Sequence, residues 1–95
     1  MTIRVLQVVP RSDYTVYVYF SDGRVKRFDA RPLVGRGVFA RLEDMDFFID
    51  RCTVLNGTLA WDLSGAYNPA ACIDIDPETL YAESAEVEDP LKHIA

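Results

Sequence analysis

The feature that most constrains this chain is the pair Asp22-Gly23, which lies between two runs of strand-forming residues. Residues 14–20 (YTVYVYF) contain only Val, Thr and aromatic residues, and residues 24–29 (RVKRFD) follow the turn. Asp-Gly between such runs is typical of a two-residue type I′ turn, because both central residues of that turn need a positive φ. We therefore predict a β-hairpin here.

The register of this hairpin follows from the position of the turn. With Asp22-Gly23 central, Phe20 faces Val25 and Tyr17 faces Phe28. These two pairs lie on opposite faces, because side chains alternate along a strand. Either both faces of the sheet are covered, or a β-bulge shifts the register. The sequence alone leaves both alternatives open.

A second hairpin is predicted in residues 52–61 (CTVLNGTLAW), where Asn56-Gly57 supplies the turn. Its strands would place apolar side chains together on one face. The predicted cross-strand pairs are Cys52 with Trp61, Val54 with Leu59, and Leu55 with Thr58.

The remaining segments indicate a further strand, short helices and a loop. Residues 2–10 are rich in β-branched residues and end at Pro10, which suits a strand end. Residues 30–50 change character, and we expect one or two short helical turns there, the second capped by Asp44. Residues 62–71 contain Ser-Gly and Asn-Pro and predict a loop.

The stretch CIDIDPETLYAES (72–84) reads as a strand that leads into a helix. Asp76 would be the N-cap and Pro77 the first helical residue, with Leu80 and Tyr81 packed back on the sheet. An alternative, weaker hypothesis is a site for Mg²⁺ or Ca²⁺, which need several converging oxygen ligands. The candidate ligands are Asp62, Asp74 and Asp76.

These elements fit one small domain. With 95 residues, 49% of them hydrophobic and 26% charged, the chain has the composition of an ordinary globular domain. We predict an α+β fold in residues 1–84: a small, mainly antiparallel sheet built from β-hairpins, with two or three short helices. We expect residues 85–95 to form an acidic, frayed C-terminal tail.

Four segments together resemble the bacterial family catalogued as domain of unknown function 2442. They are YVYFSDGRVKRFDARPL, GVFARLEDMDFF, LAWDLSG and CIDIDPETLYAES, and the resemblance covers about residues 3–84. It implies a small α+β fold with a mainly antiparallel sheet and brings no catalytic residues. In some relatives a similar domain precedes a DNA-binding helix-turn-helix, and we expect no such module here. Others are encoded beside a second small protein in a toxin–antitoxin-like arrangement.

The motifs of common enzymes are absent from the sequence. No phosphate-binding or dinucleotide-binding glycine motif occurs, and the single histidine, His93, lies near the C-terminus. We expect no enzymatic activity and no cofactor.

Cys52 and Cys72 are too few for a disulfide framework or a structural zinc site, so two reduced core thiols are expected. Without a signal peptide or a span of ~18 apolar residues, the chain is expected to be cytoplasmic, with no membrane contact.

Charge is divided unevenly along the chain, whose formal net charge is −5. Residues 1–41 hold eight Arg/Lys against three Asp, and residues 42–95 hold two Arg/Lys against twelve Asp/Glu. Either the two parts face each other in the fold, or they form opposite poles. The excess of acid predicts a protein-binding module whose partner is basic, with self-association as an alternative. The candidate contact residues are Glu43, Asp44, Asp46, Asp50, Trp61 and Tyr67. The acidic residues of the tail are the alternative source of that surface: Glu83, Glu86, Glu88 and Asp89.

A basic cluster near the first hairpin raises nucleic acid as a runner-up partner. Arg24, Lys26, Arg27 and Arg31 accompany Tyr17, Tyr19 and Phe28, which is a composition suited to single-stranded nucleic acid. Alternation, however, places Lys26 with Phe28 and Tyr19 on one face and Arg27 on the other. The sequence pI of about 4.6 also argues against such binding, so we do not expect it.

Overall fold

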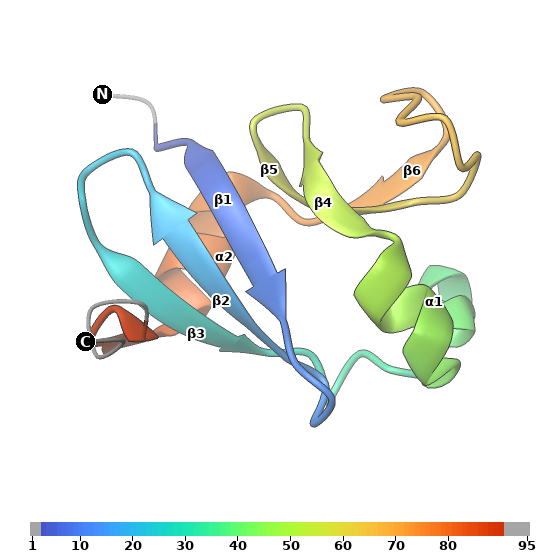
Figure 1. The fold of residues 1–95 in the computed structure, drawn as a ribbon, viewed down its shortest axis with the longest axis horizontal. Coiled ribbons are helices and arrows are strands. Elements are labelled where there is room, and N and C mark those ends of the chain that lie inside the picture. The colour runs from blue at the N-terminus through green and yellow to red at the C-terminus, as the bar shows by residue number, and fades with distance from the viewer. Residues whose placement is uncertain (1–2, 91–95) are drawn as a thin grey trace.

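Two antiparallel sheets and three short helices make up the protein (Figure 1), as seen in a computed structural model that describes residues 3–90. This arrangement confirms the predicted α+β class. The four-stranded sheet has the order β1-β2-β3-β7, and the three-stranded sheet has the order β4-β5-β6. Their strands are β1 (Val5–Pro10), β2 (Thr15–Phe20), β3 (Val25–Asp29), β7 (Ala85–Val87), β4 (Cys52–Leu55), β5 (Thr58–Asp62) and β6 (Cys72–Asp74). The helices are the 3-10 helix η1 (Gly37–Glu43), α1 (Met45–Asp50) and α2 (Pro77–Glu83).

The hairpin β2–β3 forms where it was predicted, but its register differs by one residue. Val25 pairs with Tyr19, and Phe28 pairs with Val16, so the predicted pairs Phe20–Val25 and Tyr17–Phe28 are wrong. The loop has three residues rather than two. The Phe20 N–H donates to the Arg24 carbonyl at 2.9 Å, and Gly23 has a φ of 89°.

The shifted register avoids a positive φ at Asp22, a conformation that is costly for most non-glycine residues. A type I′ turn would need that conformation at Asp22 as well as at Gly23, whereas in this loop glycine alone adopts it. The shifted register sets Phe28 opposite Val16, on the buried face that Val16 shares with Val18 and Phe20. Of the two alternatives left open by the sequence, the shifted register is the one observed.

The hairpin β4–β5 has the predicted register throughout. Asn56 and Gly57 have φ values of 56° and 73°, as a type I′ turn requires. The predicted apolar face also forms, and it joins the hydrophobic core. Its members are Cys52, Val54, Leu59 and Trp61.

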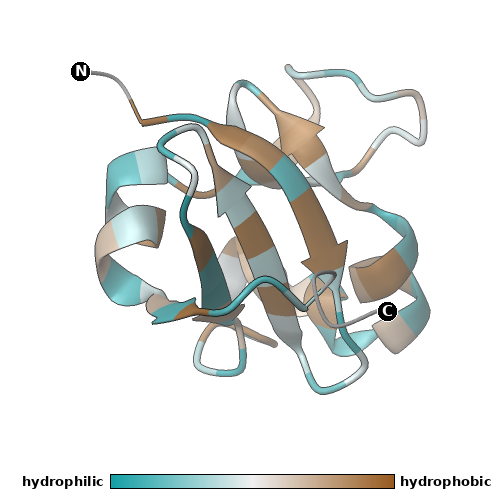
Figure 2. Cartoon of the chain, turned by 60° about the vertical axis from the view of Figure 1, so that its left-hand side comes forward, coloured by the Kyte–Doolittle hydropathy of each residue, from teal (hydrophilic) through white to brown (hydrophobic). Residues whose placement is uncertain are grey.

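The core lies between the two sheets, which meet where β1 runs beside β4 (Figure 1). The Val5 N–H donates to the Gly57 carbonyl at 2.8 Å and ties β1 to the second hairpin. Phe48 of α1 stacks near Trp61, with ring centroids 5.5 Å apart. In Figure 2 the hydrophobic colour follows the strands of both sheets, whereas the turns are mostly hydrophilic.

Both predicted helix caps are confirmed. The Asp44 carboxylate accepts hydrogen bonds from the backbone N–H groups of Asp46 and Phe47 at the start of α1. The Asp76 carboxylate accepts from the Thr79 N–H, and proline occupies the first turn of α2. These bonds satisfy donors that have no partner within the helix.

Helix α2 packs against the four-stranded sheet, behind it in Figure 1. Leu80 is fully buried, and the ring of Tyr81 meets Phe20 edge to face at a centroid distance of 4.9 Å. Both residues therefore pack back on the sheet as predicted.

The expectation of a frayed tail from residue 85 onward is wrong at its start. Residues 85–87 form strand β7, in which Val87 pairs with Val25 of β3. The strand forms because β3 would otherwise leave its backbone donors and acceptors unpaired at the sheet edge. The rest of the predicted tail, residues 91–95, lies outside the described residues.

Candidate functional site

The three carboxylates proposed as metal ligands do not form a common site. Asp76 caps α2, and Asp74 is exposed and accepts from the Asn56 amide at 3.3 Å. Asp62 is buried, with only 2% of its surface exposed. Within residues 3–90, no group of three His, Cys, Asp or Glu side chains could hold a metal ion.

Asp62 instead organises the loop that follows β5. Its carboxylate accepts hydrogen bonds from the Ser64 hydroxyl at 2.7 Å and from the Tyr67 N–H at 2.8 Å. Burial raises the pKa of Asp62, but the hydrogen bonds from Ser64 and Tyr67 and the charge of Arg51 outweigh it and hold the pKa below its ordinary value. Asp62 therefore remains a carboxylate that fixes the loop backbone.

The two cysteines lie on opposite faces of the three-stranded sheet. Cys52 pairs with Trp61 and Cys72 with Asp62, which are adjacent residues of β5. Neighbouring residues of a strand point to opposite faces, so the two thiols cannot approach each other. Both are free, and burial raises the pKa of Cys52 to about 12, which makes it a poor nucleophile at neutral pH.

The predicted acidic contact residues lie on η1 and α1. Asp44 is engaged as the cap of α1, whereas Glu43, Asp46 and Asp50 are exposed. None of these carboxylates forms an ion pair with any residue in 3–90. Their negative charge therefore faces solvent.

Within residues 3–90, few direct ion pairs join the two oppositely charged parts of the chain. Of the ion pairs between described residues, those of Arg24 with Asp22 and of Arg31 with Asp29 lie within the basic part. Only the pair of Arg24 with Glu86, at 3.4 Å, joins the two parts. This favours the alternative of separate charged surfaces.

Trp61 is not a contact residue, which corrects the prediction made for it. Its side chain is fully buried, and its indole N–H donates to the Phe48 carbonyl at 3.1 Å. The apolar face of its hairpin is the core of the protein. Tyr67, in contrast, is 64% exposed, and it lines a small polar pocket together with Asp50.

The basic cluster of the first hairpin is dispersed by the shifted register. Lys26 is buried and donates from Nζ to the Tyr81 carbonyl at 2.7 Å, and Tyr19 lies on the other face. Arg24 and Arg31 are paired with carboxylates. Arg27 stands opposite Tyr17 on the exposed face. These contacts leave little of the cluster for phosphate groups, and we do not propose nucleic acid as the partner.

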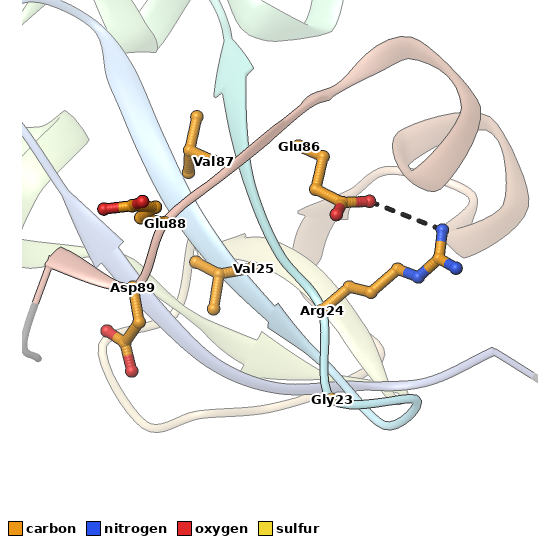
Figure 3. A pocket seen from close by; sticks show the side chains of 7 residues that line it. All are labelled: Gly23, Arg24, Val25, Glu86, Val87, Glu88 and Asp89. Atoms are coloured by element: carbon orange, nitrogen blue, oxygen red, sulfur yellow. Dashed lines mark hydrogen bonds and ion pairs between the residues drawn. The ribbon is translucent and has the colours of Figure 1, made fainter.

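A pocket of about 470 Å³ lies between the first turn and β7 (Figure 3). Val25 and Val87 line it, and the ion pair of Arg24 and Glu86 lies at one side. Asp89, also in its lining, accepts from the Tyr19 hydroxyl at 2.7 Å. The charged groups of this pocket are thus already engaged within the protein.

A second groove, of about 450 Å³, lies between η1 and β6, and we call it the β6 groove. It differs from the first pocket because apolar side chains line much of it. Arg41, whose guanidinium lies 4.3 Å from the Phe47 ring centroid, and Asp74 are its charged members. Its lining residues are Val38, Phe39, Arg41, Leu63, Cys72, Ile73 and Asp74.

Exposed apolar side chains gather at this groove. Across the described residues, four large hydrophobic side chains are exposed: Leu6, Val38, Leu63 and Tyr67. Val38 and Leu63 line the β6 groove, and Tyr67 belongs to the same loop as Leu63. The sequence analysis did not identify Val38 or Leu63. The only signal in the sequence is their position, because Val38 follows the glycines Gly35 and Gly37 and Leu63 begins the loop with Ser-Gly and Asn-Pro, and neither segment has a long amphipathic pattern that predicts burial.

The fold and the groove define a small α+β protein with a candidate docking surface. The chain belongs to the family described as "Protein of unknown function (DUF2442)", whose model matches residues 5–86. The resemblance recognised in the sequence is thereby confirmed. No curated protein and no solved structure matches the chain. Among the described residues, no helix is long and apolar enough to cross a membrane.

Proposed function

We propose that this protein is a non-enzymatic binding module that docks another protein at the β6 groove. The observation that carries the proposal is that two exposed apolar side chains, Val38 and Leu63, both line this groove, at 70% and 36% exposure. Contiguous exposed apolar surface on a small domain is typical of an interaction site. A few side chains buried in well-packed pockets contribute most of the binding energy in protein interfaces, so a preformed groove is a suitable place for a partner's anchor residue.

The charge distribution supports a basic partner. Glu43, Asp46 and Asp50 carry negative charge on η1 and α1, and no ion pair within residues 3–90 offsets it. Helix η1 also forms one wall of the groove, so these carboxylates belong to the same end of the protein. Complementary charge raises the rate of association and discourages acidic competitors.

The test uses the full-length protein as bait in a lysate of the native cell. The Val38→Asp and Leu63→Asp variants are compared with wild type, and co-purified proteins are quantified by mass spectrometry. A charge in the groove should reduce recovery of the specific partner by at least tenfold, because an unpaired carboxylate is costly in an apolar contact.

Leu6→Asp is the matched control, because Leu6 is 67% exposed but does not line the groove. This variant should recover the partner as wild type does. Circular dichroism and thermal unfolding would establish that all three variants are folded. Equal loss of the partner in the control, or no loss in either groove variant, would contradict docking at the groove.

A further inference from the structure

The outer edge of β6 presents backbone groups that no strand within residues 3–90 uses. The Ala71 carbonyl accepts from Leu63 at 3.0 Å, and the Ile75 N–H donates to Leu59 at 3.1 Å, so residues 71 and 75 face β5. Backbone groups of an antiparallel strand alternate in direction. The N–H and C=O groups of Cys72 and Asp74 therefore point away from β5, toward the open side of the sheet.

This open side coincides with the β6 groove. Three consecutive residues of β6 line the groove, which therefore runs along the strand. None of the backbone hydrogen bonds between described residues uses the outward groups of Cys72 or Asp74. A row of unpaired strand groups is a template for another strand.

The two edges of the four-stranded sheet are better protected. Strand β1 has a register irregularity between Val5 and Gln7, ends at Pro10, and is tied to the second hairpin through Gly57. Bulges and prolines are common devices against strand addition. Strand β7 carries the exposed Glu86, which is paired with Arg24. The edge of β6 has no bulge or proline, and apolar side chains flank it.

We propose that an extended basic segment of another protein adds to β6 as a fourth, edge strand of the three-stranded sheet. The inference rests on the proposed function and specifies how the partner is held. Main-chain hydrogen bonds to Cys72 and Asp74 would supply affinity, and pockets for alternate side chains would supply specificity, as in other strand-addition complexes.

The two faces of the sheet at β6 determine which side chains should alternate along the added strand. Ile73 pairs with the core residue Trp61, whereas Asp74 pairs with Ala60 on the opposite face of the sheet. The added strand would therefore place apolar side chains on the face of Ile73 and basic side chains beside the exposed Asp74 carboxylate. Lysine and valine in alternation fulfil both conditions.

The experiment uses a seven-residue peptide of alternating valine and lysine, acetylated and amidated, as the probe. It is titrated to millimolar concentration into ¹⁵N-labelled full-length protein, and amide hydrogen exchange is followed by NMR. We expect exchange at Cys72 and Asp74 to slow by at least fivefold, because both amides would become hydrogen-bonded. Unchanged exchange at both amides would overturn the inference.

Two modified peptides test the strand geometry. One is N-methylated at its valines and the other at its lysines, so each lacks the donors on one edge only. If the peptide adds as a strand, only one of the two modified peptides should fail to slow amide exchange at Cys72 and Asp74. Equal protection by both would indicate contact through side chains alone and would overturn strand addition.

A variant of β6 completes the test. Cys72→Pro removes an outward N–H without removing a bond to β5, and proline is tolerated on such edges. Its peptide affinity should fall at least fivefold relative to Cys72→Val, with protection of Asp74 as the readout and thermal unfolding as the check of folding. An affinity equal to that of Cys72→Val in a folded protein would contradict the inference.

The inference and the proposed function can fail separately. Loss of the native partner in Val38→Asp and Leu63→Asp, together with unprotected Cys72 and Asp74 amides, would leave the docking site in place and remove strand addition. Protected Cys72 and Asp74 amides, together with groove variants that still recover the native partner, would support strand addition of the peptide and contradict docking of the native partner at the groove.

Discussion

At the scale of single residues, carboxylates in this protein serve three different purposes. Asp44 and Asp76 cap helices, Asp62 is buried and fixes a loop, and Asp46 and Asp50 face solvent without ion pairs in the described chain. The residue type is the same in each case, and the surroundings decide its role. The first two roles can be tested by measuring stability.

Replacement of Asp76 tests its role as a cap. Asp76→Ala should lower the free energy of unfolding by about 0.5–2 kcal/mol, because the Thr79 N–H loses its acceptor. Asp76→Ser should restore most of the loss, since serine also caps helices. Urea unfolding of the three proteins gives the comparison. If Ser were as damaging as Ala and added Mg²⁺ stabilised only wild type, Asp76 would be a metal ligand rather than a cap.

Asp62 should make stability depend on pH. A carboxyl group whose folded pKa is depressed contributes stability that is present above its ordinary pKa, 3.8 here, and is lost as the pH falls through the folded value. The melting temperature of the wild-type protein should therefore decrease as the pH is lowered past about 4. Asp62→Asn should melt lower than wild type at pH 7 and lose part of this pH dependence.

Asp50→Asn is the control for this measurement, because Asp50 is exposed and has no ion pair within residues 3–90. It should follow the wild-type melting curve at every pH. Calorimetry from about pH 2.5 to pH 7 would give the melting temperatures of wild type, Asp62→Asn and Asp50→Asn for this comparison. An Asp62→Asn curve parallel to that of wild type would show that Asp62 does not carry the effect.

At the scale of elements, each turn or strand edge depends on what surrounds it. The Asn56-Gly57 turn has two residues with positive φ, whereas at Asp22-Gly23 only the glycine does. Asparagine and aspartate both tolerate this conformation more readily than most residues. The difference therefore comes from the strands, because the shifted register pairs Phe28 with the buried Val16, whereas a two-residue turn would pair it with the half-buried Tyr17.

Strand β7 allows a test of an element through truncation. A chain that ends after Ser84 loses the pairing of β7 with β3 and uncovers Val25, which is 8% exposed in the intact fold. Its free energy of unfolding should fall by about 1–3 kcal/mol, from lost apolar burial and hydrogen bonds. A chain that ends after Pro90 keeps β7 and should unfold at a higher urea concentration than the chain that ends after Ser84. Equal midpoints for the two chains would contradict a structural role for β7.

At the scale of the whole molecule, charge and apolar surface are both concentrated at one end. The β6 groove, the exposed loop residues Leu63 and Tyr67, and the carboxylates of η1 and α1 come from segments that meet only in the fold. Apolar contacts would supply affinity there, and the negative charge would act mainly on the association rate. The two contributions can be separated by salt.

Charge reversal at Glu43, Asp46 and Asp50 to lysine tests the electrostatic contribution. Stability should change by no more than about 0.5 kcal/mol, because these exposed side chains have no ion pair to lose in the described chain. The association rate with the co-purified partner should fall at least tenfold at low salt. This difference should shrink as salt screens the charges.

Reversal of Glu78 and Glu83 on α2 to lysine provides the comparison for net charge. Surface plasmon resonance at several salt concentrations would give the effect per reversed charge. The α2 variant should have the smaller effect per charge. Equal effects would assign the electrostatic contribution to the net charge of the protein, and an unchanged low-salt rate in the η1–α1 variant would exclude that surface.

The local features of this protein were determined by the sequence itself. The caps at Asp44 and Asp76, the Asn56-Gly57 turn with its register, and the α+β class were all predicted and are confirmed. Each depends on hydrogen bonds or φ preferences within a few consecutive residues. The family was likewise recognisable from four short segments.

Features that depend on distant segments were decided only by the tertiary structure. The register of β2–β3, the burial of Trp61, the addition of β7 to β3 and the β6 groove each require surfaces from separate parts of the chain to meet. Alternation along a strand gives two faces but does not say which face another element will cover. That choice is made by the packing of the whole core, where burying one set of apolar side chains together outweighs any local preference.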